Sequence, residues 1–277
     1  MNPTTFAKLY SIFSSKQWHG KETHEIVFKN FCELMGNLNE KQQNLMLELS
    51  ERYIWLSHPE YQRKLIKIFN SIPEDEIDGI DSIILFPIMR PEEEKKTKSA
   101  HGILLSLRGI TPFLEKFTDI SWKEIESFEI LAKKKYTLAE NEIVFLLDDF
   151  LGTGDTIKST IEKLLNETDI SVEKIKVITI ASHEKALDYL QDVGVKYYTD
   201  IITCKGISDY YGDTELKKNI DTMLEIENLL PSKKFSFGYG ESEALITLYR
   251  TPNNTFPIFW HDYKKNKTKY KAPFPRY

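Results

Sequence analysis

One stretch, residues 142–158, limits the choice of fold more than any other part of the chain. It reads E-I-V-F-L-L-D-D-F-L-G-T-G-D-T-I-K. The continuous apolar run at 143–147 is typical of a strand buried on both faces of a parallel sheet. Small residues after it predict a tight loop, and apolar residues then recur at helical spacing at Ile157, Ile161, Leu164 and Leu165. The stretch therefore predicts a strand, an acidic pair, a small-residue loop and a helix.

The loop suits a phosphate group. Gly152 and Gly154 let backbone N–H groups close around an anion at the helix N-terminus, where the helix dipole also favours negative charge. The carboxylates Asp148 and Asp149 would repel a phosphate, so they suit ribose hydroxyls or a Mg²⁺ ion that bridges to phosphate oxygens. The alternative is a plain acidic turn between strand and helix, because Asp, Gly and Thr all favour caps and bends.

The rest of the chain from residue 76 alternates between strand and helix patterns. Further strands are predicted at 83–88, 175–180, 195–204 and 244–249, and helices within 118–135, at 184–192 and at 213–230. This alternation predicts an α/β fold, a parallel Rossmann-like sheet flanked by helices. Ligands of such sheets bind at the carboxyl ends of the strands, where the acidic pair lies.

Residues 1–75 carry helical apolar stripes and no phosphate loop. We therefore expect two domains, a helical N-terminal subdomain at 1–75 and an α/β domain at 76–277. The helices would cap or flank the sheet, or meet a partner protein. The basic tail at 264–276 is expected to be a solvated end, with docking onto an acidic partner or nucleic acid left open.

Composition excludes several classes of protein. A net charge of −5 argues against direct binding to nucleic acid. The sequence has no apolar run that could span a bilayer and no signal-peptide pattern at its start, so no membrane partner is expected. Cys32 and Cys204 lie far apart without metal-ligand spacing, which favours the reducing cytoplasm.

The order apolar strand, D-D, two residues, G-T-G-D-T resembles the phosphoribosyl-pyrophosphate (PRPP) loop of type I phosphoribosyltransferases. The resemblance implies that Asp148 and Asp149 are the catalytic acids, which hold the ribose hydroxyls and Mg²⁺. It also implies that the following segment binds substrate, with its T-G-x-T part around the 5′-phosphate. The segment consists of Phe150, Leu151, Gly152, Thr153, Gly154, Asp155 and Thr156. Purine-salvage members carry an acidic residue at the position of Gly152, which argues against ordinary purine transfer here.

A second region narrows the resemblance to one branch. The run T-P-N-N-T-x-P-I-x-W at 251–260 is similar to PRTase-CE proteins, a phosphoribosyltransferase-like branch found in bacterial conflict and phage-defence loci. The preceding F-x-x-G-Y-G resembles, more weakly, the segment of purine enzymes in which an aromatic ring stacks on the base. Asn253 and Asn254 are candidates for ligand contact, and an Asx-rich turn is the alternative.

The loop after the first core strand faces pyrophosphate in this family. That topology makes Arg90 a candidate substrate ligand. The charged segment at 91–99 is either a solvated loop or a flexible loop that closes over PRPP, with Lys95, Lys96 or Lys98 on pyrophosphate. Ser99, which we expect to cap the next helix, is a further substrate-binding candidate.

The resemblance implies an enzyme of the glycosyltransferase type in nucleotide metabolism. It would bind PRPP or a related ribose 5-phosphate compound with Mg²⁺ and act at the anomeric carbon, as an effector in an anti-phage system with partner proteins on its N-terminal helices. The alternative is a catalytically inactive PRPP- or nucleotide-binding regulatory or partner-docking protein. The acceptor stays open.

Overall fold

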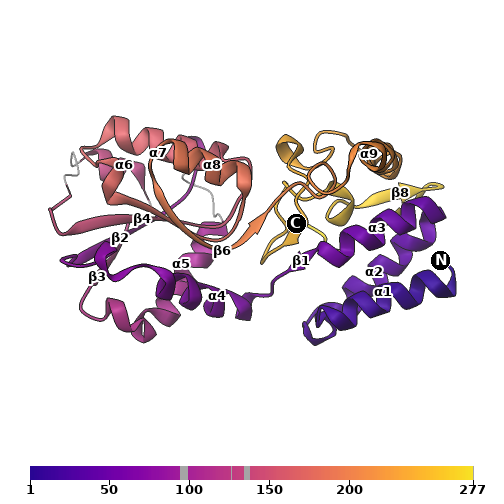
Figure 1. Cartoon of the computed structure of the whole chain (residues 1–277), viewed down its shortest axis with the longest axis horizontal. Helices are drawn as coiled ribbons and strands as arrows, with labels where there is room; N and C mark the ends of the chain where they lie inside the picture. The colour runs from indigo at the N-terminus through magenta and orange to yellow at the C-terminus, as the bar shows by residue number, and fades with distance from the viewer. Residues whose placement is uncertain (94–98, 126, 134–137, 277) are drawn as a thin grey trace. The chain divides into compact units, whose positions relative to one another are not determined.

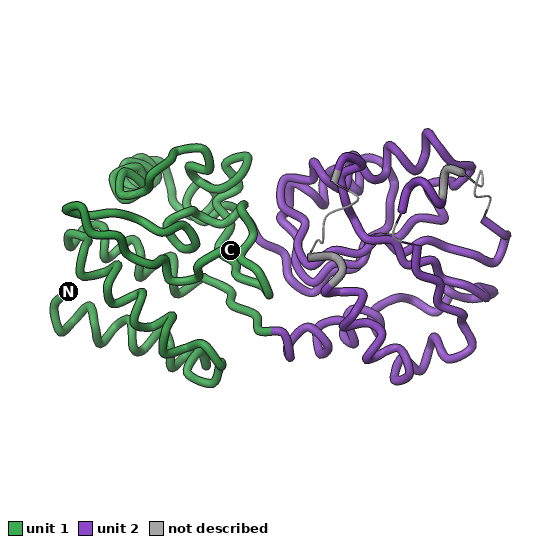
Figure 2. Tube along the Cα trace, turned by 180° about the vertical axis from the view of Figure 1, so that it is seen from behind, with its two compact units in different colours: residues 1–57, 204–277 green, residues 58–203 purple. Residues whose placement is uncertain are grey.

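The chain forms two compact units, shown in different colours in Figure 2. The computed structural model describes residues 1–93, 99–125, 127–133 and 138–276. His58–Thr203 forms one unit, and Met1–Ser57 together with Cys204–Tyr277 forms the other. This division differs from the predicted one at residue 75, because α4 (His58–Ser71) belongs with the sheet and the C-terminal segment joins the first three helices. An apolar helical stripe shows that a helix is packed, and it does not show against what.

The unit at 58–203 is built on one five-stranded parallel sheet with the order β3-β2-β4-β5-β6. The strands are β2 (Ser82–Pro87), β3 (Ser121–Glu124), β4 (Glu142–Leu151), β5 (Ile175–His183) and β6 (Lys196–Thr203). The predicted α/β class is therefore confirmed. Because all strands run the same way, their carboxyl ends meet along one edge.

Helices cover both faces of this sheet (Figure 1). The helices other than α4 are α5 (Ser99–Ile110), α6 (Phe128–Lys133), α7 (Asp155–Glu167) and α8 (Glu184–Asp192). Val144 and Leu146 of β4 share a buried cluster with residues of α7 and α8. Phe145, between them, lies 6.0 Å from Phe69 of α4, measured between ring centroids. Successive residues of β4 thus point to opposite faces, as the pleat of a strand requires.

Two elements differ from the sequence prediction. The helix predicted within 118–135 is replaced by the short edge strand β3 and by α6, with Ile83 of β2 opposite Trp122. Trp122 packs 5.8 Å from Phe69, so the aromatic side chain that suggested a helical stripe belongs to a strand. β4 is longer than predicted and runs to Leu151, which places the acidic pair inside the strand.

The other unit is mainly helical. Its elements are α1 (Pro3–Ser15), α2 (His24–Asn37), α3 (Glu40–Arg52), α9 (Asp213–Glu227), the parallel pair β1 (Ile54–Trp55) and β7 (Ile246–Thr247), and the hairpin of β8 (Tyr263–Lys265) and β9 (Thr268–Tyr270). Within the strand predicted at 244–249, residues 246 and 247 form β7. None of the helices in the described ranges is long and apolar enough to cross a bilayer.

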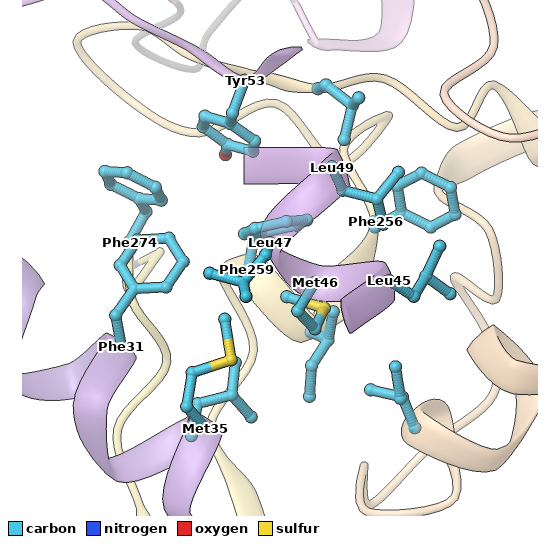
Figure 3. Packing of buried hydrophobic residues seen from close by; sticks show 14 of the residues in the cluster. Phe31, Met35, Leu45, Met46, Leu47, Leu49, Tyr53, Phe256, Phe259 and Phe274 are labelled. Carbon is cyan, nitrogen blue, oxygen red and sulfur yellow. The ribbon is translucent and has the colours of Figure 1, made fainter. Parts of the chain in front are cut away.

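The core of this unit joins the two ends of the chain (Figure 3). Phe31 of α2 and Tyr53 pack against Phe259 and Phe274 from the C-terminal segment. The rings of Tyr53 and Phe274 are stacked, with centroids 5.0 Å apart. Phe274 is only 4% exposed, so the prediction of a solvated tail was wrong for residues 272–274, whereas most of 264–271 is exposed. Tails rich in Lys and Pro look solvated in sequence, but here the apolar residues between the charges are anchors.

A tight turn at 237–243 needs glycine at one position. Gly238 has φ of +82°, and a Cβ there would lie 1.9 Å from the carbonyl oxygen of Asn254. Phe237 and Glu243 also have positive φ. Burial raises the pKa of the Glu227 carboxyl, which accepts the N–H of Phe237 at 3.0 Å. The Glu243 carboxylate accepts the N–H of Ile207 at 2.7 Å.

Candidate functional site

The loop between β4 and α7 ends at a glycine N-cap, so no cap side chain bonds to the start of the helix. Gly154 is the N-cap of α7, with φ of +88° and no side-chain hydrogen bond to the helix. The first helical bond runs from the N–H of Lys158 to the carbonyl of Gly154 at 2.9 Å. The N–H groups of residues 155–157 therefore have no acceptor within the helix. Such a helix start attracts anions through its amides and its dipole.

The predicted loop residues fall into two groups. Gly152, Thr153 and Thr156 are half-buried and Asp155 is exposed, so the bend is not filled by packed side chains. Phe150 and Leu151 are 8% and 3% exposed, so only their main chain can contribute to a site at this loop. Leu151 packs in the same buried cluster as Val144 and Leu146, which explains its burial.

The two acidic side chains have different surroundings. Asp149 is 4% exposed and its Oδ2 accepts the hydroxyl of Tyr61 at 3.0 Å. Tyr61 lies on α4, so Asp149 points to the face that carries α4. Asp148, one residue earlier, is half-buried and belongs to the opposite face by strand alternation. Its Oδ1 accepts the backbone N–H of Asp149 at 2.9 Å.

Arg90 lies beside the loop, as the topology predicts. The Ile88 N–H donates to the carbonyl of Leu147 at 2.8 Å. This bond keeps the chain that follows β2 beside β4. Arg90 Nη2 then lies 3.9 Å from Asp155 Oδ2 at the start of α7. Thr160 fixes this approach, because its buried hydroxyl lies 2.9 Å from the Met89 carbonyl and accepts the Met89 N–H at 3.3 Å. A positive side chain and a helix N-terminus are thus brought together.

The remaining predicted ligands are not part of this arrangement. Lys95, Lys96 and Lys98 lie outside the described residues, and Ser99 begins α5 without a described side chain. Asn253 and Asn254 belong to the other unit.

The asparagines serve the turn at 237–243. Asn254 is 7% exposed, and its amide donates to Ser242 Oγ at 3.1 Å and to the Tyr239 carbonyl at 3.3 Å. The carbonyl of Asn253 accepts the Tyr239 N–H at 2.8 Å. These contacts favour the Asx-rich turn over ligand contact for Asn254.

Three residues near the loop were missed from the sequence. Tyr61 contacts Asp149 of the acidic pair, and Thr160 contacts Met89 in the chain after β2. His183 ends β5, and its Nδ1 accepts the Lys185 N–H at 3.2 Å. Thr160 had a detectable signal, since it is a polar residue inside the apolar stripe of Ile157 and Ile161. Tyr61 had none, because its partner is 88 positions away in sequence.

The acidic pair has the chemistry that Mg²⁺ prefers. Among the described residues no group of three or more His, Cys, Asp or Glu side chains could hold a metal ion by itself. Mg²⁺ is usually bound through one or two carboxylates, with waters and substrate phosphates as the other ligands. Asp148 and Asp149 therefore fit an ion that arrives with a phosphorylated substrate.

Comparison with known proteins identifies the family. Three solved phosphoribosyltransferases are similar over part of the chain, but their low TM-scores lend no weight to the assignment. The hypoxanthine-guanine enzyme of Schistosoma mansoni has 16% identity, covers 55% of this chain and 68% of its own, and has a TM-score of 0.33. For the purine enzyme of Pyrococcus horikoshii these values are 15%, 54%, 87% and 0.32. For the orotate enzyme of Aeropyrum pernix they are 12%, 52%, 70% and 0.31.

No curated protein matches the chain. The PRTase-CE family matches it over residues 28–276, which include all of the sheet and most of both units. The predicted branch is confirmed by this match. The chain is therefore a phosphoribosyltransferase-like protein that belongs to the PRTase-CE family.

Proposed function

We propose that the protein is a phosphoribosyltransferase-type enzyme of the cytoplasm that binds PRPP, or a related ribose 5-phosphate compound, with Mg²⁺. The observation that carries the proposal is the uncapped start of α7 at Gly154, with Arg90 and the half-buried Asp148 beside it. Family membership supports the same reaction type. The run at 251–260 is similar to PRTase-CE proteins from phage-defence loci, so we propose that the enzyme acts in an anti-phage system.

Each group of residues would bind the part of the substrate that suits its charge. The amides of residues 155–157 and the hydroxyls of Thr153 and Thr156 would hold the 5′-phosphate. The carboxylates of Asp148 and Asp149 would accept hydrogen bonds from the ribose hydroxyls and hold Mg²⁺. Mg²⁺ would supply positive charge for the pyrophosphate oxygens. Arg90 would add a second positive group for the pyrophosphate.

The bond from the anomeric carbon to the pyrophosphate oxygen breaks as a bond to the acceptor forms. Positive charge develops on the ribose ring and negative charge on the departing pyrophosphate. Fixed donors and carboxylates in the right places stabilise both charges without reorganising during the reaction. The acceptor stays open: a nucleobase is the default for the family, and a nucleotide or nucleoside is equally compatible.

The direct test measures pyrophosphate release with PRPP, Mg²⁺ and a panel of bases and nucleosides. Asp148→Asn should abolish release, because it removes the negative charge at this end of the sheet while the amide oxygen can still accept the N–H of Asp149. Asp188→Asn, an exposed carboxylate on α8, is the matched control and should release pyrophosphate at the wild-type rate. Equal rates in Asp148→Asn and wild type would refute the assignment.

A catalytically inactive PRPP or nucleotide sensor is the second candidate. Gly152 favours it, because the position lacks the acidic side chain that purine-salvage members carry there. Calorimetry distinguishes the two functions. Tight binding of PRPP with no release of pyrophosphate for any acceptor supports the sensor, and turnover that depends on Asp148 supports the enzyme.

Partner proteins of the defence system would bind the N-terminal helices. Phe6, Tyr10 and Ile26 are 45%, 52% and 62% exposed there. Phe28 joins them, with its ring 5.7 Å from Phe6 and 6.2 Å from Tyr10. Ile26→Glu should reduce capture of proteins encoded in the same locus. Leu105→Glu on α5 is the control, because Leu105 is also 62% exposed. Equal capture by both variants would rule out this surface.

A further inference from the structure

A buried hydrogen bond links α4 to the acidic pair. The Tyr61 hydroxyl donates to Asp149 Oδ2 at 3.0 Å. Tyr61 is 1% exposed and Asp149 is 4% exposed, so water does not compete for this bond. Hydrogen bonds to a charged acceptor are roughly twice as strong as neutral ones, and a low-dielectric setting strengthens them further. The bond therefore restrains the plane of the carboxylate at the end of β4.

The helix that carries Tyr61 is itself fixed to the sheet. Tyr61, Leu65 and Ile68 lie on one face of α4, and each is 1% exposed or less. This spacing of four and three residues makes one continuous contact stripe. On the same helix, Lys64 and Lys67 both pair with Asp200 of β6, whose side chain is 2% exposed. α4 cannot rotate without breaking these contacts, so it holds the Tyr61 hydroxyl in place.

Asp148 has a different arrangement. It points to the opposite face and is half-buried, and its Oδ1 accepts the N–H of the next residue. The two carboxylates can act on one ribose only if each is held in a defined direction. Side chains that bind a ligand need second contacts that lock their orientation. For Asp149 the structure supplies that contact from α4.

We infer that Tyr61 is a positioning residue for the ribose-binding acid Asp149. This inference rests on the proposed function and adds to it a residue outside the motif, on an element that precedes the sheet. Tyr61 does not touch the substrate. Its bond to Oδ2 restrains the plane of the Asp149 carboxylate and hence how the carboxylate meets the sugar hydroxyls.

Tyr61→Phe is the test variant, because it keeps the buried ring and removes only the hydroxyl. Tyr53→Phe is the matched control. Tyr53 is 0% exposed and its hydroxyl lies 2.7 Å from Thr247 Oγ1, in the unit that does not contain Asp149. Calorimetry of the full chain measures the binding of PRPP with Mg²⁺ and, separately, of inorganic phosphate.

Tyr61→Phe should weaken PRPP binding about tenfold or more, the size expected for a lost hydrogen bond to a charged group. Binding of inorganic phosphate should stay within about twofold of wild type, because the α7 amides are untouched. Tyr53→Phe should leave both affinities unchanged.

Three outcomes would overturn the inference. Unchanged PRPP binding in Tyr61→Phe would show that the hydroxyl does not position Asp149. A parallel loss of phosphate and PRPP binding would show a collapsed loop and a purely structural role. If the wild-type chain binds no PRPP, the proposed function fails as well, and that result is recognisable before any variant is measured.

Discussion

Gly154 is the residue on which the anion site most depends. Its φ of +88° lies in the left-handed region, and an added Cβ would lie 3.4 Å from the Cα of Ala186. We expect Gly154→Ala to lower the free energy of unfolding by about 1–2 kcal/mol, the cost of left-handed backbone with a side chain. It should also abolish phosphate binding, because relief of the strain moves the first amides of α7.

Gly79 provides the control for this variant. Its φ is +71°, and a Cβ there would meet nothing within 4 Å. It lies before β2, at the edge of the sheet away from the loop. Gly79→Ala should therefore lose similar stability, measured by chemical denaturation, and keep phosphate binding. Loss of binding in both variants would trace the effect to stability alone.

Removal of the Asp149 carboxylate should lower the free energy of unfolding more than removal of the Asp148 carboxylate. Asp149→Ala leaves the Tyr61 hydroxyl buried without its acceptor, and such a group costs about 1–3 kcal/mol. Asp148→Ala, at a half-buried position, should cost about 1 kcal/mol or less. Both variants should lose PRPP binding. Thermal melts beside calorimetry test this, and equal destabilisation by the two variants would contradict it.

At the scale of elements, the Glu76 carboxylate links the amino ends of two strands, at the end of the sheet opposite the loop. Glu76 pairs with Lys176 at the start of β5 and with Lys196 at the start of β6. The side chains of Glu76 and Lys176 are 8% and 6% exposed. Burial opposes ionisation of Glu76, but the hydrogen bonds and charges of the two lysines outweigh it and hold its pKa below the ordinary value.

This contact gives a pH-dependent prediction. A carboxyl whose pKa is lowered on folding stabilises the fold above its unfolded pKa of 4.5 and loses that effect as the pH falls through its folded pKa. Glu76→Gln should therefore unfold more easily at pH 7, by about 3 kcal/mol because Lys176 stays buried. The difference from wild type should shrink below pH 4.5.

A control for Glu76→Gln comes from an exposed pair. Glu167 pairs with Lys163 on α7 at 2.7 Å, and their side chains are 43% and 25% exposed. Glu167→Gln should change stability by about 0.5 kcal/mol or less. Neither variant should alter PRPP binding. A pH profile of Glu76→Gln parallel to that of wild type would refute the assigned role of the carboxylate.

Buried strands and isolated helices were readable from sequence, and contacts between distant elements were not. The apolar runs of β2 and β4 are typical of strands buried on both faces of a sheet. The helix at 184–192 was predicted with the bounds that α8 has. β3 was missed because it is a four-residue edge strand whose residues alternate between exposed and half-buried.

The same distinction applies to the candidate site. The motif located the acids, the loop and the helix start, because they are contiguous in sequence. The contacts of Tyr61 and Thr160 depend on how α4 and the chain after β2 pack, and a single sequence does not encode that in any local pattern. The turn at 237–243 shows the converse. Gly238 and Gly240 are a local sign of a bent backbone, and Asn254 and two buried carboxylates hold the turn in place.

At the scale of the whole molecule, the unit at 58–203 should fold by itself. It is one continuous segment with all five strands and helices on both faces of its sheet. It also contains Tyr61, Arg90 and the loop. We expect an isolated 58–203 fragment to unfold cooperatively and to bind inorganic phosphate like the full chain. Circular dichroism with thermal melting, followed by calorimetry, tests this.

An isolated 1–57 fragment is the comparison. Its helices share their core with Phe256, Phe259 and Phe274 of the C-terminal segment, so the fragment should not fold. If 1–57 folds and 58–203 does not, the two compact units do not correspond to parts of the chain that are stable independently. Deleting the N-terminal helices is for the same reason a poor test of partner docking, because the deletion uncovers half of a core.

The pairing of β1 with β7 has a consequence for how a cell makes this protein. A ribosome releases the first three helices long before the segment that covers them, with the entire sheet produced in between. At about 5–20 residues per second, those apolar faces wait roughly 10–40 s for Phe256 and the residues after it. During that interval the nascent chain is open to aggregation and to chaperones. We therefore expect the yield of folded protein to depend on how fast translation reaches Phe256 and the core residues after it.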